Sequence, residues 1–233
     1  MLNIQIDNNN DYICDLSYTN SYYTQNNNKI DPSNTCATTS MIQALDLSGY
    51  SSLFPKGNYD QAEDNLTYFI RNDSRVLDYY KKIDYYNYSN WITSPSGVNV
   101  YPPNEIHQVL SYGTNLWIGK QVTQFTTNFS INDIPSQILI KNRPLVMSGV
   151  FHKLNHVITC IGITVKKESF ELKEPKDIGF FDCTNFIFND SFGYTWDYTQ
   201  NRNGEKVRFT PNQVIMLLKS KDNPTEKWVH LFN

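Results

Sequence analysis

Cys36, His156 and Asp182 follow one another along the chain, each next to a predicted helix or strand. Cys36 opens an apolar helix predicted over residues 35–47, His156 begins a strand-like run, and Asp182 ends another. The positive end of a helix dipole favours a thiolate, and an imidazole can hold that thiolate as an ion pair. A third group must then orient the imidazole. The order therefore predicts acyl transfer by a cysteine nucleophile.

The other cysteines fit the role of nucleophile less well. These are Cys14, Cys160 and Cys183, of which Cys160 lies in the middle of a predicted strand and Cys183 directly follows the predicted orienting acid. A small buried thiol that fills space in a helix is the alternative for Cys36 itself. Without a secretion signal, the four cysteines are expected to be free thiols.

His152 competes with His156 for the role of catalytic base. It lies in a predicted turn, whereas His156 stands at the mouth of a strand, where an imidazole has rigid support. The two histidines also have the i, i+4 spacing of a helical zinc site. The residues between them lack the glutamate of that motif and follow a turn-then-strand pattern, so no metal site is expected.

Three short patches carry a resemblance to a known family. They are the stretch from Tyr23 to Met41 around Cys36, the run Asn155-His156-Val157-Ile158, and Phe181-Asp182-Cys183. With these patches the chain resembles the papain-like cysteine peptidases, in particular the bacteriocin-processing, double-glycine type and its stand-alone and phage-lysin-like relatives. The resemblance runs from about residue 22 to the C-terminus. It implies a papain-like fold, with a helical N-terminal lobe against an antiparallel sheet.

The resemblance also implies roles for two further residues. Gln25, eleven positions before Cys36, would stabilise the oxyanion together with the Cys36 backbone N–H, which requires the intervening loop to fold back. Asp182 would accept a hydrogen bond from the imidazole of His156 and fix its tautomer. Relatives often have proline after this aspartate, where this chain has Cys183, and Asn185 is the nearby alternative.

Composition and charge limit the classes of function. The 233 residues are 39% hydrophobic and 14% aromatic, which supports one core, so a single domain over 1–233 is expected, with its peptidase core over about 20–233. The net charge of −3 predicts no nucleic-acid partner. The N-terminus lacks the pattern of a signal peptide and no apolar run is long enough to span a bilayer. We expect a cytoplasmic product that reaches a cell wall only after release.

Apolar spacing divides the chain into two halves. The first half predicts four helices. Two of them cover residues 35–47 and 74–83, a third follows a capping pair at Asp60 and Glu63, and a fourth runs from the prolines at 102 and 103 to Gly113, which is expected to end it. The second half predicts strands over 117–125, 144–150, 157–165, 178–182 and 228–232, with helices over 131–141 and 211–218. Helices followed by an antiparallel sheet predict the α+β class.

The expected function is that of a papain-like cysteine hydrolase that cleaves a peptide bond through a thioester and needs no cofactor. The resemblance makes a lysin-type endopeptidase, with cell-wall peptides as its substrate, the expected form. The Tyr- and Asn-rich segment 51–100, a variable insertion, is the expected source of substrate selectivity. The alternative is a binding module that keeps the papain-like scaffold without hydrolysis.

Overall fold

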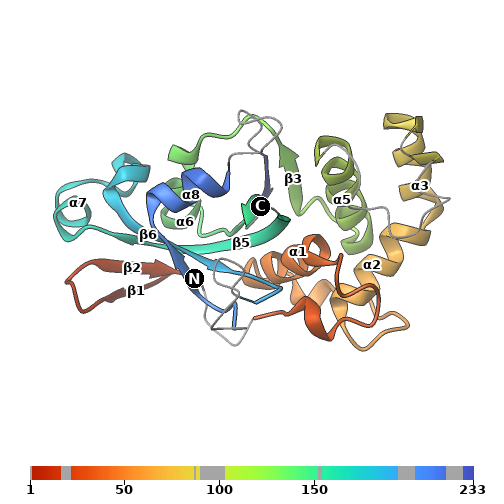
Figure 1. The fold of residues 1–233 in the computed structure, drawn as a ribbon, viewed down its shortest axis with the longest axis horizontal. Coiled ribbons are helices and arrows are strands. Elements are labelled where there is room, and N and C mark those ends of the chain that lie inside the picture. Colours follow the sequence, from red (N-terminus) through yellow and green to blue (C-terminus); the bar gives the residue numbers. More distant parts are fainter. Residues whose placement is uncertain are drawn as a thin grey trace.

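The chain forms an open antiparallel sheet with helices packed against it (Figure 1). The computed structural model describes residues 2–16, 22–86, 88–89, 103–151, 154–193, 203–218 and 228–233. The strands are β1 (Asn3–Ile6), β2 (Tyr12–Asp15), β3 (Thr123–Thr126), β4 (Leu145–Phe151), β5 (Leu154–Val165), β6 (Cys183–Asn189), β7 (Val207–Phe209) and β8 (Val229–Phe232). The helices are α1 (Cys36–Leu47), α2 (Ala62–Asn72), α3 (Ser74–Ile83), α5 (Pro103–Ile118), α6 (Ile134–Leu139), α7 (Lys167–Leu172) and α8 (Pro211–Leu217). The predicted α+β class is confirmed.

Short 3-10 helices connect these elements. They are η1 (Gln25–Asn27), η2 (Ser51–Leu53), η4 (Ile131–Asp133), η5 (Pro175–Asp177) and η6 (Phe180–Asp182). Two of them contain residues that the sequence predicts to be catalytic: Gln25 lies in η1 and Asp182 in η6.

Strand β5 is the longest strand described and organises the sheet. Its first half pairs with β4, with His156 opposite Gly149, and its second half pairs with β2 along the same edge. Strand β6 pairs with the other edge, from Cys183 opposite Val165 to Asn189 opposite Thr159. Strand β6 therefore ends three residues before it would reach His156, and the chain that follows it is free to turn toward that side chain.

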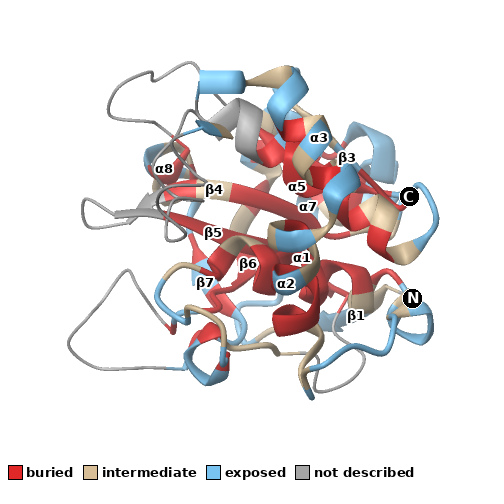
Figure 2. Cartoon of the chain, turned by 90° about the vertical axis from the view of Figure 1, so that its right-hand side faces the viewer, coloured by how far each residue is buried: buried red, intermediate tan, exposed pale blue. Residues whose placement is uncertain are grey.

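Alternating side chains of the sheet enter two separate cores. In β4, Leu145 and Met147 pack with α6 and α8, whereas Val146 packs with the core of α1, α2, α3 and α5. This is the period of two expected when a strand is covered on both faces. Figure 2 shows α1 buried along nearly its whole length between the sheet and the outer helices. The helix that begins at Cys36 is thus enclosed on several sides.

The structure confirms some of the predicted helices and strands and contradicts others. The helices at residues 36–47, 74–83 and 211–217 and the strands at 145–151, 154–165 and 229–232 are confirmed. The N-terminal strands β1 and β2 were not predicted. The strand expected over 178–182 is wrong, because Phe180–Asp182 is a 3-10 helix that buries Phe180, and the strand begins one residue later.

Gly113 does not end a helix, since α5 continues to Ile118. A Cβ atom at this position would lie 2.9 Å from a side-chain carbon of Ile70 in α2. The missing side chain therefore allows α2 and α5 to approach closely. The capping pair expected at Asp60 is also wrong, because Asp60 pairs with Lys29 and the residue before α2 is Gln61.

Candidate active site

Helix α1 and strand β5 bring Cys36 and His156 together. Ser40, one turn after Cys36, donates a hydrogen bond from its hydroxyl to the Val157 carbonyl at 3.0 Å. Thr159 donates in return to the Ser40 carbonyl at 3.2 Å. These bonds fix the first turn of α1 against the part of β5 that carries His156. The thiol of Cys36 forms a side-chain hydrogen bond with the His156 ring.

The electrostatics of this pair favour a thiolate and an imidazolium. Burial raises the pKa of Cys36, but the hydrogen bond and positive charge of His156, with backbone hydrogen bonds of Val157 and Ala37, lower it below the usual value of a thiol. Burial lowers the pKa of His156, but the hydrogen bonds and charges of Asp190 and Cys36 raise it to about 10. Each group therefore stabilises the charged form of the other.

Asp190 is the acid that contacts His156. Its Oδ1 lies 2.7 Å from His156 Nε2, and its side chain is fully buried. Because Nε2 is engaged with this carboxylate, Nδ1 is the ring nitrogen left for the thiol of Cys36. The residue follows the end of β6 directly, where that strand stops short of His156. Cys36, His156 and Asp190 thus form a continuous chain of hydrogen bonds.

Asp182, predicted to orient the imidazole, lies at the opposite end of β5. It is followed by Cys183, which pairs with Val165, so nine residue steps of roughly 3.3 Å each, about 30 Å, separate it from the level of His156. Its carboxylate instead accepts hydrogen bonds from Lys173 at 2.7 Å and from Ser169 at 2.9 Å. The assignment of Asp182 is therefore corrected to Asp190. Asn185, the alternative, pairs with Thr164 and is equally remote.

A small network holds the backbone of Asp190. Tyr22 donates from its hydroxyl to the Asp190 carbonyl at 2.8 Å and accepts from the Gly204 N–H at 3.2 Å. The Asp190 N–H donates to the Gly204 carbonyl at 2.8 Å. A Cβ atom at Gly204 would lie 2.0 Å from the Asp190 carbonyl oxygen, so only glycine fits there. The Phe192 N–H also donates to the Asp190 carboxylate, at 3.1 Å.

Gln25 is buried beside the residue that follows Asp190. Its Oε1 accepts a hydrogen bond from the Ser191 hydroxyl at 2.8 Å, and its backbone N–H donates to the Ser191 carbonyl at 2.8 Å. Its Nε2 donates to the Pro32 carbonyl at 2.8 Å. An amide nitrogen has two hydrogens, so one remains for an oxyanion. The loop between Gln25 and Cys36 does fold back, as its proposed role requires.

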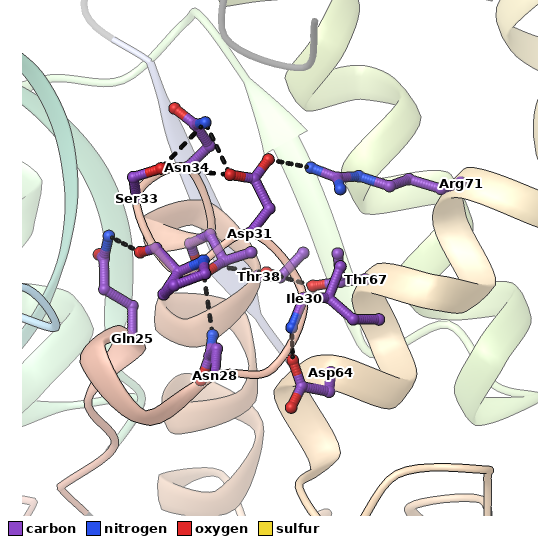
Figure 3. Close-up of polar contacts among 12 residues, drawn as sticks. Gln25, Asn28, Ile30, Asp31, Ser33, Asn34, Thr38, Asp64, Thr67 and Arg71 are labelled. Atoms are coloured by element: carbon purple, nitrogen blue, oxygen red, sulfur yellow. Dashed lines mark hydrogen bonds and ion pairs between the residues drawn. The ribbon is translucent and has the colours of Figure 1, made fainter. Parts of the chain in front are cut away.

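The folded-back loop is anchored by three polar side chains (Figure 3). Asn28 donates to the hydroxyls of Thr35 and Thr39 at 2.9 and 3.0 Å. Asp64 of α2 accepts from the backbone N–H groups of Lys29 and Ile30, each at 2.9 Å at its closest, and Figure 3 shows the contact with Ile30. Asp31 accepts from Asn34 at 2.8 Å. The approach to α1 is therefore fixed by side chains of the loop and of α2.

A second pair of buried histidines lies outside this chain of hydrogen bonds. His107 Nδ1 and His230 Nε2 are 2.9 Å apart, and burial lowers the pKa of both rings, that of His230 to about 3. Both rings are therefore neutral at pH 7. Among the described residues, no group of three or more His, Cys, Asp or Glu side chains is arranged to hold a metal ion. His152, the competing base, lies outside the described residues.

Sequence reasoning missed Asp190, although a signal for it was present. The buried run Phe186-Ile187-Phe188 precedes Asn189 and Asp190, which is the same strand-then-acid pattern used to choose Asp182. The error was in the choice of strand and not in the type of residue.

Neither models of known protein families nor the sequences of curated proteins match this chain. In the part of the chain that the structure describes, no helix combines the length and apolar character needed to cross a membrane. The case for a function therefore depends on the geometry of the site.

Proposed function

We propose that the protein is a cysteine hydrolase of papain-like fold that cleaves an amide bond of a peptide through a thioester. The observation that carries the proposal is the buried chain of hydrogen bonds from Cys36 through His156 to Asp190. A helical region that supplies the thiol and an antiparallel sheet that supplies the imidazole support the same fold assignment.

The reaction assigns one task to each side chain. The Cys36 thiolate attacks the amide carbon, and the electron pair of the carbonyl moves to its oxygen. Gln25 Nε2–H and the Cys36 backbone N–H, which has no partner within the first turn of a helix, would donate to that oxyanion. The C–N bond then breaks as the His156 imidazolium protonates the leaving amine.

Water completes the cycle. Neutral His156 takes a proton from water, and the resulting hydroxide attacks the thioester carbon. The acid leaves, the Cys36 thiolate is restored, and His156 again carries the proton. Asp190 holds the ring in one tautomer and stabilises its positive charge throughout. No step requires a cofactor.

Thiol alkylation tests the proposal directly. An ordinary thiol with a pKa of about 8.5 is almost fully protonated at pH 6 and reacts slowly with iodoacetamide. We expect rapid modification of Cys36 at pH 6, located by peptide mass spectrometry, and its loss in Cys36→Ala. Slow labelling of Cys36 at this pH would overturn the proposal and favour a binding module on the same scaffold.

The substrate is the second part of the test. Purified cell-wall fragments, the substrate of a lysin-type endopeptidase, and a mixed peptide library would be incubated with the wild type and with Cys36→Ala. Mass spectrometry of the products identifies the bond that breaks. Products that form equally with Cys36→Ala would contradict the assigned nucleophile.

A further inference from the structure

A pocket opens beside the first turn of α1, among the helices of the Cys36 side of the molecule. Its walls are mostly apolar and come from α2, α3 and α5. The residues that give them this character are Ile70, Val76, Leu77, Tyr80, Val109 and Leu110. Such a concave, mostly apolar volume is typical of a small-molecule or side-chain binding site.

The pocket adjoins the proposed nucleophile on both sides along the chain. Asn34 and Thr35 before Cys36, and Ala37 and Thr38 after it, line the pocket, as does Val157 next to His156. The backbone N–H groups of Val157 and Ala37, two of these lining residues, form hydrogen bonds with the sulfur of Cys36. A group bound in the pocket therefore lies next to the residues that contact the thiol.

Arg71 supplies one unsatisfied donor at this pocket. Its guanidinium reaches from α2 to Asp31, with which it forms an ion pair at 2.9 Å (Figure 3). Its Nε–H is buried and finds no hydrogen-bond partner among the described residues. A buried donor without a partner lowers stability, and a ligand that supplies an acceptor restores that loss. Because Asp31 already balances the charge, a neutral carbonyl oxygen fits this donor better than a carboxylate.

His107 adds no charge to the walls. Burial and the neighbouring His230 lower its pKa well below the usual value, so the ring is neutral. The walls therefore present apolar surface, the uncharged polar groups of Asn34 and three threonines, a neutral ring and one compensated ion pair. A charged side chain would lose its hydration there without gaining a partner.

We propose that this pocket binds a large, uncharged aliphatic or aromatic side chain of the substrate, next to the scissile amide, with Arg71 Nε–H donating to a carbonyl oxygen of the substrate backbone. The inference rests on the proposed function and narrows it. It favours peptides rich in apolar residues at the cleavage point over cell-wall peptides that carry charged side chains. It also assigns the selectivity expected of segment 51–100 to the apolar faces of α2 and α3, which include Tyr80, and not to the Tyr and Asn content of the segment as a whole.

Small electrophiles test the pocket without requiring hydrolysis. Chloroacetyl amides of leucine, phenylalanine, lysine, glutamate and glycine place the side chain on one side of the reacting carbon, and acetyl-amino-acid chloromethyl ketones place it on the other. In both series the Cys36 sulfur displaces chloride and forms a thioether. We expect the leucine and phenylalanine probes of at least one series to label Cys36 about tenfold faster than the glycine probe, because they bury apolar surface. The lysine and glutamate probes should gain nothing.

Leu77→Trp provides the matched variant, since Leu77 is half-buried at the pocket and a larger ring fills it. The leucine-to-glycine rate ratio should fall toward one. Leu172→Trp, on α7 and 85% exposed, is the same substitution away from the pocket and should keep the ratio. Thermal unfolding of both variants checks that they fold.

Two failures are distinguishable in this design. If iodoacetamide does not label Cys36 at pH 6, the proposed function fails. If Cys36 is labelled but neither series prefers apolar probes, or if Leu77→Trp keeps the preference, the pocket assignment is overturned while the nucleophile stands.

Discussion

The two ends of β5 contain similar residue types but opposite electrostatics. At one end Cys36 and Asp190 flank His156, and the pKa of the thiol is lowered. At the other end Cys183 follows Asp182, and burial with the neighbouring carboxylate raises the pKa of that thiol. The difference is the imidazole, which supplies a positive charge between sulfur and carboxylate. The pKa of a buried cysteine next to an acid is raised, whereas the pKa of a cysteine with a histidine between it and the acid is lowered.

The largest expected effect is the difference in reactivity among the four thiols. Burial raises the pKa of Cys14 and of Cys160 to about 12, so at pH 6 almost none of either is thiolate. Each pH unit below the pKa lowers the thiolate fraction tenfold. We expect Cys36 to be alkylated at least about a thousandfold faster than the other three cysteines of the native protein. Quantitative mass spectrometry of time courses measures the four alkylation rates. Equal rates would contradict the difference in thiol reactivity between the two ends of β5.

The next effect compares the two acids. Asp190→Asn removes the charge that supports the His156 imidazolium and should lower the alkylation rate at pH 6, and any amidase activity, by about a hundredfold. Asp182→Asn is the matched change at the far end of β5 and should leave both rates unchanged. A loss of activity in Asp182→Asn with none in Asp190→Asn would restore the acid first expected from the sequence.

The pH dependence of the unfolding free energy distinguishes Asp190 from Asp182 in another way. The pKa of His156 is raised from 6.5 to about 10 on folding, so its stabilising contribution is complete below pH 6.5 and is lost as the pH rises through about 10. The gap in unfolding free energy between the wild type and Asp190→Asn should therefore shrink between pH 7 and 10. Urea unfolding at several pH values measures it.

Asp182→Asn is the control for this pH series. The pKa of Asp182 is lowered from 3.8, because hydrogen bonds with Lys173, Gly179 and Ser169 outweigh the effect of burial. Its contribution is lost only in acid, as the pH falls through its folded pKa. The difference in unfolding free energy between the wild type and Asp182→Asn should stay constant from pH 7 to 9. If this difference narrows as much as it does for Asp190→Asn, the ion pair assigned to His156 and Asp190 is contradicted.

The smallest effect concerns the support of Asp190. Tyr22→Phe removes a hydroxyl that bridges the Asp190 carbonyl and the Gly204 N–H, and should lower the unfolding free energy by about 1 kcal/mol. The alkylation rate at pH 6 should fall only a few-fold, because the carboxylate keeps its contact with His156. Tyr12→Phe, which removes an exposed hydroxyl bond to Glu171, is the control. Equal losses in both variants would show that Tyr22 has no positioning role.

The sequence predicted the helix that begins at Cys36 well because its signals are local. Apolar spacing and the preceding Pro32 place the start of α1 at Cys36, and the capping box of Thr210 and Gln213 defines α8. The orienting acid could not be chosen in this way. A short apolar run looks the same in a strand and in a 3-10 helix that buries Phe180, and only the register of β6 on β5 decides which acid reaches His156.

The pocket beside α1 could not be predicted from the sequence either. Its walls come from α2, α3 and α5, which are separated along the chain and meet only through tertiary packing. The Tyr and Asn content of segment 51–100 does not indicate which of its residues line the pocket. Most of those that do are not Tyr or Asn: Thr67, Ile70, Arg71, Val76 and Leu77 line it together with Tyr80.

The carboxylate of Asp64 limits how this molecule can be re-engineered. By accepting hydrogen bonds from Lys29 and Ile30, it ties α2 to the loop that leads into α1, and the hydroxyls of Thr38 and Thr67 join the same two helices at 2.8 Å. A chimera that replaces the whole of segment 51–100 would remove the hydrogen bonds that hold the loop before α1. Grafts that start after Arg71 keep these bonds, so a library that diversifies α3 alone would change the walls of the pocket and leave the start of α1 in place.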